Sequence, residues 1–294
     1  MRDVVDVAVF GVIAGTIYAL IALSIVLTYR GSKVLNFALG EIGTLGLFVT
    51  WALRDRAGVP YLPAAVLGIG TAIALGVMFE WLVVRPMMDA ERLAVAVATV
   101  GLGLAILAIE EVRNGPTPRA LPPAVHGVAF HLDAVPVTWA QVLAFAGAVV
   151  VTATLTGLLR RSDFGLAVLA AAQDPAAVRL VGAPLWKLSS FTWGVGSGLA
   201  VVAALLYEPT VAVFEPGFGS RLFVYGLIAA VVGGLTDLRG ALAGGLVVGL
   251  LEATAKQINV HLSVNSGLPT AAVAGALLLV LLLRPSGLVG TGRR

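Results

Sequence analysis

Long apolar runs follow one another along this sequence and constrain its fold more than any other feature. Residues 7–27, 62–84, 93–109 and 142–159 are among the runs that reach or approach the roughly 20 residues needed to cross about 30 Å of hydrocarbon as a helix. Hydrophobic residues make up 59% of the 294 residues and charged residues only 12%. The alternation at period two that a transmembrane barrel requires is absent. We therefore predict an all-α fold, a polytopic membrane helical bundle.

The apolar runs divide into about eight or nine membrane segments, and we expect some of them to be broken or re-entrant. We place the segments at 7–29, 36–53, 62–84, 92–111, 138–159, 189–207, 221–235, 241–258 and 268–284, within a single transmembrane domain over 1–294. The first run is too long for the core of a signal peptide, so we expect it to be retained.

Basic residues indicate how the bundle is oriented. With the amino terminus outside, 12 of the 19 Lys and Arg residues lie on the cytoplasmic side, as the positive-inside rule favours. The polar loop 160–188 then faces the cytoplasm. The longest external loop, 114–137, contains five prolines, which favour extended or turn backbone over helix.

The sequence lacks the residue patterns of common enzyme and metal sites. It contains no cysteine, which excludes disulfides and thiolate metal sites. All three histidines fall outside the predicted spans, so Ser197 in the Gly196-Ser197-Gly198 motif has no intramembrane histidine to activate it. We therefore expect no catalytic residues, no metal and no cofactor. A G-x-x-x-x-G-K-[ST] loop is also absent, so we expect no ATPase site, and ATP coupling would require another polypeptide.

Few charged residues fall inside the predicted spans, where an ionised side chain costs at least roughly 2.5–3.5 kcal/mol and therefore faces protein or water more often than lipid. Those considered as candidates are Glu41, Glu80, Glu110, Glu111, Glu252 and Lys256. We expect Glu80, Glu110 and Glu111 to be solvated near span ends. Glu252 and Lys256 are four residues apart in the favourable Glu-before-Lys order, so we expect them to form an ion pair.

Glu41 lies deeper in its predicted span and follows Asn36 by five residues, and these two residues admit two interpretations. In the first, they are structural and cap a broken helix or bond to a neighbouring helix. In the second, they line a polar translocation path or form its gate, since polar groups retained inside a membrane commonly mark solute pathways. The residues alone leave both interpretations open.

Small residues in the predicted span 241–258 and just before it favour close helix packing. Gly240, Gly244, Gly245 and Gly249 form overlapping G-x-x-x-G spacings, which let helix backbones approach closely. Generic packing within the bundle explains this pattern. A subunit interface or a sliding surface in a moving transporter is the alternative.

The loop 160–188 contains one short segment with helix-capping residues at both ends. Asp174 is a favourable N-cap, Pro175 suits the first helical position, and Gly182 can adopt the left-handed conformation that ends a helix. We therefore predict an independent helix over 174–182. It would either contact a partner protein or rest as an amphipathic helix on the lipid headgroups.

Several motifs, spread over nearly the whole chain, resemble the permeases of bacterial branched-chain amino acid ABC transporters. They are Thr16-Ile17-Tyr18-Ala19-Leu20-Ile21-Ala22-Leu23, Val34-Leu35-Asn36-Phe37-Ala38-Leu39-Gly40-Glu41, Arg85-Pro86, Gln173-Asp174-Pro175, Val181-Gly182, Val232-Gly233-Gly234-Leu235 and Arg284-Pro285-Ser286-Gly287-Leu288. The family usually has Asn-Phe-Ala-His-Gly-Glu, and here Leu39 stands where that histidine would be. The chain is similar to the shorter of the two permease types.

The resemblance implies an importer in the bacterial cell (inner) membrane. Two permease subunits pair within the lipid bilayer, two cytoplasmic ATP-binding subunits drive them, and an extracytoplasmic binding protein delivers branched-chain amino acids or related small solutes. No nucleic acid partner is expected. The resemblance also implies that 174–182 is the ATPase-coupling element, formed by Asp174, Pro175, Ala176, Ala177, Val178, Arg179 and Gly182.

A different class of protein remains compatible with the residues. In a stand-alone channel or ion-coupled secondary transporter, Glu41 or the Glu252–Lys256 pair would bind a proton or another ion. The sequence does not name the solute, and it does not say whether the second permease is a copy of this chain.

Overall fold

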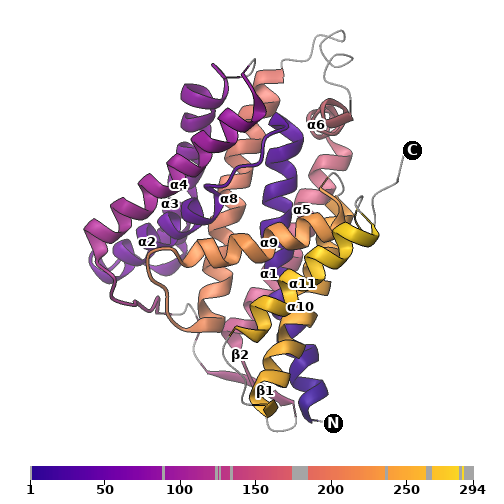
Figure 1. Cartoon of the computed structure of the whole chain (residues 1–294). Helices are drawn as coiled ribbons and strands as arrows, with labels where there is room; N and C mark the ends of the chain where they lie inside the picture. The colour runs from indigo at the N-terminus through magenta and orange to yellow at the C-terminus, as the bar shows by residue number, and fades with distance from the viewer. Residues whose placement is uncertain are drawn as a thin grey trace.

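The structure, a computed structural model, describes residues 2–87, 90–122, 125, 127–132, 135–173, 185–235, 238–262, 267–284 and 287. Its elements are α1 (Arg2–Ser32), α2 (Leu39–Asp55), α3 (Tyr61–Phe79), the π-helical turn η1 (Glu80–Val84), α4 (Arg92–Asn114), β1 (Val128–Leu132), β2 (Val135–Thr138), α5 (Trp139–Arg161), α6 (Asp163–Gln173), α8 (Leu185–Val211), α9 (Phe218–Gly233), α10 (Leu238–Leu262) and α11 (Leu268–Leu283). The predicted all-α, polytopic membrane helical bundle is confirmed (Figure 1).

Six helices in the described part of the chain are long and apolar enough to cross a membrane: α1, α3 with η1, α4, α5, α8 and α10. Three predicted segments, 36–53, 221–235 and 268–284, correspond instead to the shorter helices α2, α9 and α11, which have 17, 16 and 16 residues. Sixteen helical residues extend only about 24 Å. Figure 1 shows α9 lying across the long axes of α1 and α8. The nine predicted segments therefore correspond to six helices of membrane-spanning length and three shorter helices.

The centre of the bundle is formed by α1 and α8. Both are buried over most of their apolar stretch, whereas only 28–33% of the apolar stretch is buried in α3, α4 and α5. Ser24 of α1 donates a hydrogen bond to the Gly196 carbonyl oxygen of α8 at 2.8 Å, and a Cβ on Gly196 would overlap the Thr28 hydroxyl. Gly196 thus serves close packing of α8 on α1, whereas Ser197 and Gly198 of the same motif pack against α3.

The two loops that were assigned to opposite sides of the membrane lie at opposite ends of the bundle. Helix α6, in the polar loop 160–188, is at one end, and the start of α1 and the β1–β2 hairpin are at the other (Figure 1). The hairpin occupies part of the proline-containing loop 114–137, and its two strands are extended as predicted. Thr138 then begins α5 with a capping box shared with Gln141.

Helix α6 was not expected from the sequence. The Ser162 hydroxyl oxygen accepts a hydrogen bond from the Gly165 backbone N–H at 3.0 Å, which caps the start of this helix. Serine followed by an apolar segment is the signal that would have identified it. The predicted helix 174–182, with all of its proposed coupling residues, lies outside the described residues, between α6 and α8.

The expectation that Glu80 is solvated was wrong, because its side chain is fully buried. The π-helical turn continues the helix past Phe79 and directs Glu80 toward α8. There the carboxylate accepts hydrogen bonds from the Ser190 hydroxyl at 2.6 Å and from the Arg85 guanidinium at 3.1 Å. One carboxylate oxygen is therefore compensated by an ion pair and a hydroxyl donor, and the other has no hydrogen-bond partner among the described residues. Glu111, in contrast, is exposed as expected.

Candidate functional site

The stretch between α1 and α2 interrupts helical structure at a buried position, and side chains satisfy its backbone. The Asn36 side-chain oxygen accepts a hydrogen bond from the Ala38 backbone N–H at 3.0 Å. The Thr99 hydroxyl oxygen, on α4, accepts one from the Phe37 backbone N–H at 3.1 Å. Non-helical backbone at membrane depth is tolerated only when its polar groups find such partners. Asn36 thus stabilises the break that precedes α2, as the structural interpretation of this residue predicts.

Helices α2 and α9 meet at their amino-terminal ends. Gly40 and Gly219 bring the two backbones into direct contact, since a Cβ on either residue would overlap the other's carbonyl oxygen. The Gly219 N–H donates a hydrogen bond to the Thr44 hydroxyl oxygen at 2.8 Å. Helix amino termini carry partial positive charge, so this junction favours an anionic group.

Glu41 supplies that anionic group from the first turn of α2. Its side chain is 5% exposed, and one carboxylate oxygen accepts a hydrogen bond from the Ser220 hydroxyl at the start of α9. Within the described part of the chain, the other oxygen has no hydrogen-bond partner. A carboxylate oxygen that is buried and unpaired in this way is costly to retain. Glu41 shares this feature with Glu80 and Glu110 and is a candidate functional residue on that ground.

Glu110 lies near Glu41, contrary to the expectation that it would be solvated. It is 1% exposed, and its electrostatic neighbours include the Glu41 carboxylate and the Gly217 backbone N–H. Glu110 was expected to be solvated because it lies near the end of an apolar run in the sequence. In the structure α4 continues to Asn114, and Glu110 is held inside the bundle. The junction therefore combines two carboxylates with the serine at position 220, which sequence reasoning had not selected.

An aromatic pair, Phe37 and Phe223, lies beside this junction. Phe37, 36% exposed, approaches Phe223 of α9 edge-on, with ring centroids 5.9 Å apart. Leu39, at the position where the related motif has histidine, is completely buried in the apolar core. The short segment 36–41 therefore carries both buried polar side chains, Asn36 and Glu41, and the exposed apolar side chain of Phe37.

A second polar cluster lies on α1, α8 and α10. The predicted ion pair is confirmed, with Lys256 Nζ 2.8 Å from Glu252 Oε1. The Tyr18 hydroxyl donates a hydrogen bond to Glu252 Oε2 at 2.5 Å, and the Tyr207 hydroxyl lies 3.5 Å from that of Tyr18. Local spacing revealed the ion pair, but the two tyrosines were not predicted because they come from distant helices.

The four glycines proposed for helix packing lie on α10 where it meets α9 and α1. A Cβ on Gly240 or Gly244 would overlap backbone of α9, and a Cβ on Gly245 or Gly249 would overlap α1. These contacts are within one chain. They account for the close approach of the three helices without a second subunit.

Comparison with known proteins identifies the family. Residues 7–284 match the family described as "Branched-chain amino acid transport system / permease component". The chain is 28% identical to the high-affinity branched-chain amino acid transport system permease protein BraD of Pseudomonas aeruginosa, over 95% of this chain and 94% of the relative. It is 27% identical to the permease protein LivH of Escherichia coli, over 95% of this chain and 93% of the relative.

A solved structure titled "PsaBC from Streptococcus pneumoniae in complex with Fab" aligns over 97% of this chain and 93% of that chain, with 12% identity and a TM-score of 0.49. The family assignment rests on the sequence match, which covers both halves of the chain and the Asn36–Glu41 segment. With its six long apolar helices, the chain is a multi-pass membrane permease and belongs to the family of branched-chain amino acid transport system permease components.

Proposed function

We propose that this chain is the translocation subunit of an ABC importer in the bacterial cell (inner) membrane, and that it carries branched-chain amino acids or related small solutes. The family match over residues 7–284 carries this proposal. Relatives named as branched-chain amino acid permeases, aligned over 95% of the chain, support the solute class.

The energy source in this proposal is a pair of separate cytoplasmic ATP-binding subunits. The sequence has no P-loop, so it is a translocation subunit and not itself an ATPase. The coupling element is the segment 174–182 within the cytoplasmic loop 160–188. An extracytoplasmic binding protein, which docks on the side of the loop 114–137, and a second permease complete the transporter.

The translocation path in this proposal passes the junction of α2 and α9. Asn36 shapes the break before α2, and Glu41 provides a buried carboxylate in the first turn of α2. Phe37, between these two residues in the sequence, is partly exposed. The break is satisfied by Asn36 and Thr99 and gives the path a fixed wall. The Glu41–Ser220 contact joins α2 and α9 at this wall. Both roles follow the pattern of polar residues at solute pathways in membranes.

Uptake by whole cells tests the proposed function. A strain that lacks this gene is expected to lose most binding-protein-dependent uptake of radiolabelled leucine, isoleucine and valine, and a plasmid copy is expected to restore it. Arsenate, which depletes ATP, should abolish this uptake, whereas a protonophore applied with ATP maintained should not. Uptake that collapses with the proton gradient while ATP is maintained would contradict the proposal. The same assay with radiolabelled urea and small amides would show whether the chain carries these solutes instead of branched-chain amino acids.

A further inference from the structure

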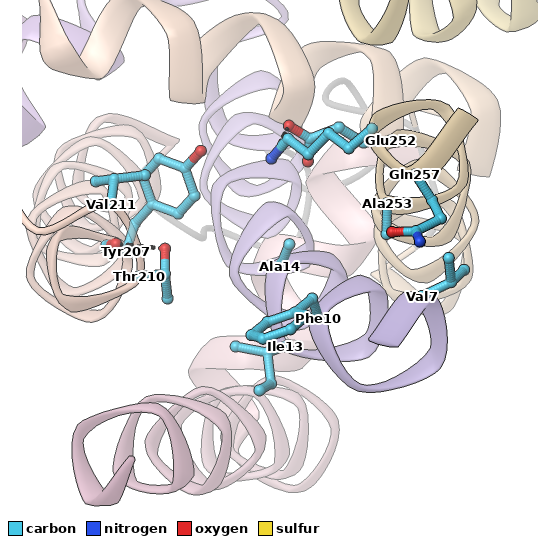
Figure 2. A pocket seen from close by; sticks show the side chains of 11 residues that line it. Val7, Phe10, Ile13, Ala14, Tyr207, Thr210, Val211, Glu252, Ala253 and Gln257 are labelled. Carbon is cyan, nitrogen blue, oxygen red and sulfur yellow. Dashed lines mark hydrogen bonds and ion pairs between the residues drawn. The ribbon is translucent and has the colours of Figure 1, made fainter. Parts of the chain in front are cut away.

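Two cavities meet at the Glu252–Lys256 pair. The first, about 200 Å³, lies between α1, α8 and α10, and Figure 2 shows Tyr207 and Glu252 pointing toward each other across it. The second, about 450 Å³, lies between α8, α9, α10 and α11. Four residues line both: Tyr207, Val211, Glu252 and Lys256. The larger cavity falls within the size range of small-molecule sites.

The ion pair leaves its cation available to a ligand. Glu252 is 3% exposed, and its two oxygens accept from Tyr18 and Lys256. The Lys256 side chain is 57% exposed and lines both cavities. An ammonium group has three N–H donors, and the bond to Glu252 uses one of them. Lys256 can therefore bind a carboxylate while Glu252 holds it in position.

The larger cavity also contains an anionic group and an apolar surface. Glu215 lines it, with its side chain 42% exposed and paired with Arg221 at 3.0 Å. The apolar lining residues include Val211, Val213, Phe214, Phe218 and Pro269. The cavity is thus lined by two cations, Lys256 and Arg221, by two carboxylates, Glu215 and Glu252, and by an apolar wall. Such a lining complements a small molecule that has a carboxylate, an ammonium group and an aliphatic side chain.

The pair has a structural role, because loss of Lys256 would leave the buried Glu252 carboxylate without its cation. A structural role alone does not explain why Lys256 also lines two cavities. Charged groups within membrane segments are costly and commonly mark ligand pathways. The exposure of Lys256 to two cavities, and not to the surface alone, fits a ligand-binding role.

We propose that the cavity between α8, α9, α10 and α11 binds an aliphatic α-amino acid as its zwitterion, with the carboxylate on Lys256 and the ammonium group on Glu215. This site rests on the proposed function, since it deepens the solute class by adding recognition within the permease itself. Neither Glu41 nor Ser220 lines this cavity, so the site accounts for charged residues that the Glu41 junction does not use.

Ligand binding to the assembled transporter in nanodiscs, without the binding protein, tests this site. Saturation-transfer NMR would compare leucine with leucinamide, which lacks the carboxylate, and with 4-methylpentanoate, which lacks the ammonium group. Leucine is expected to bind at least about tenfold more tightly than either analogue, because a hydrogen bond to a charged group contributes this much. Lys256→Met should lower leucine affinity to that of leucinamide and leave leucinamide binding unchanged.

Matched variants separate recognition from general effects. Lys256→Arg should retain the preference for leucine over leucinamide. Glu215→Gln should remove the preference for leucine over 4-methylpentanoate. Arg113→Met removes an exposed positive charge at the end of α4, outside the cavity, and should change nothing. Melting temperatures of all variants would show whether any loss of binding reflects unfolding.

The outcomes distinguish the site from the proposed function. Equal binding of leucine and leucinamide, wild-type binding by Lys256→Met, or no binding of leucine at all would overturn the site. ATP-driven leucine uptake by the same preparation, with the binding protein added, would persist in those cases and leave the proposed function intact. If that uptake is absent for every branched-chain amino acid, the proposed function itself fails.

Discussion

Replacing Gly219 with valine is expected to prevent correct assembly of the bundle and to abolish uptake. Gly219 lies in the first turn of α9 against the Gly40 carbonyl oxygen, and any Cβ there overlaps backbone that belongs to α2. Backbone cannot move aside as a flexible side chain can. Overpacking in a rigid contact typically costs about 1–3 kcal/mol, and a branched side chain falls at or beyond the upper end of that range. The same change displaces Ser220 from Glu41.

The measurements for this variant are the yield of monodisperse protein in detergent, the melting temperature and leucine uptake. Gly101→Val is the matched control, because Gly101 is a helical glycine on α4 with no atom near its added Cβ. It should retain wild-type yield and uptake. If Gly219→Val behaves like Gly101→Val in all three measurements, α2 and α9 do not meet in the way described.

Replacing Ala177 with aspartate is expected to uncouple ATP hydrolysis from uptake while the protein remains inserted in the membrane. In the predicted helix 174–182, Asp174 is the N-cap and Ala177 is the third helical residue, a position at which a negative charge stabilises the helix. The helix should therefore persist. The new charge would lie beside the apolar residues Val178, Leu180 and Val181, in the surface proposed to dock on the ATPase, and burying it there is costly.

Uptake and ATPase activity of the assembled transporter in liposomes would measure this effect. We expect uptake to fall by at least about tenfold, the loss that corresponds to about 1.4 kcal/mol of docking free energy. Ala212→Asp, at the opposite end of the bundle in an exposed left-handed position that aspartate tolerates, is the control. Normal, ATP-coupled uptake by Ala177→Asp would exclude 174–182 as the coupling element.

The sequence predicted features that depend on local spacing. Apolar run length predicted the helical bundle, since a membrane helix needs about 20 apolar residues. The Glu252–Lys256 pair was predictable because its members are four residues apart on one helix. Asn36 could be recognised as a cap candidate because its acceptor bonds a backbone N–H only two residues away.

Features that depend on distant partners were missed. Ser220 is 179 residues from Glu41, and Ser190 is 110 residues from Glu80. Nothing in the span around Glu80 indicated that α8 would provide a hydroxyl donor. Hydropathy also failed to distinguish the central helices α1 and α8 from the exposed helices α4 and α5, because all four are apolar around most of their circumference.

The proposed function requires that this chain moves solute only as part of an ATP-driven assembly, and reconstitution would test this requirement. Leucine uptake would be measured in liposomes that contain the purified chain alone, and in liposomes that contain it with its ATP-binding subunits, second permease and binding protein. We expect uptake only in the complete assembly and only with ATP inside the compartment that faces the ATP-binding subunits. Uptake of leucine at a comparable rate by the chain alone, driven by a proton or sodium gradient, would contradict it.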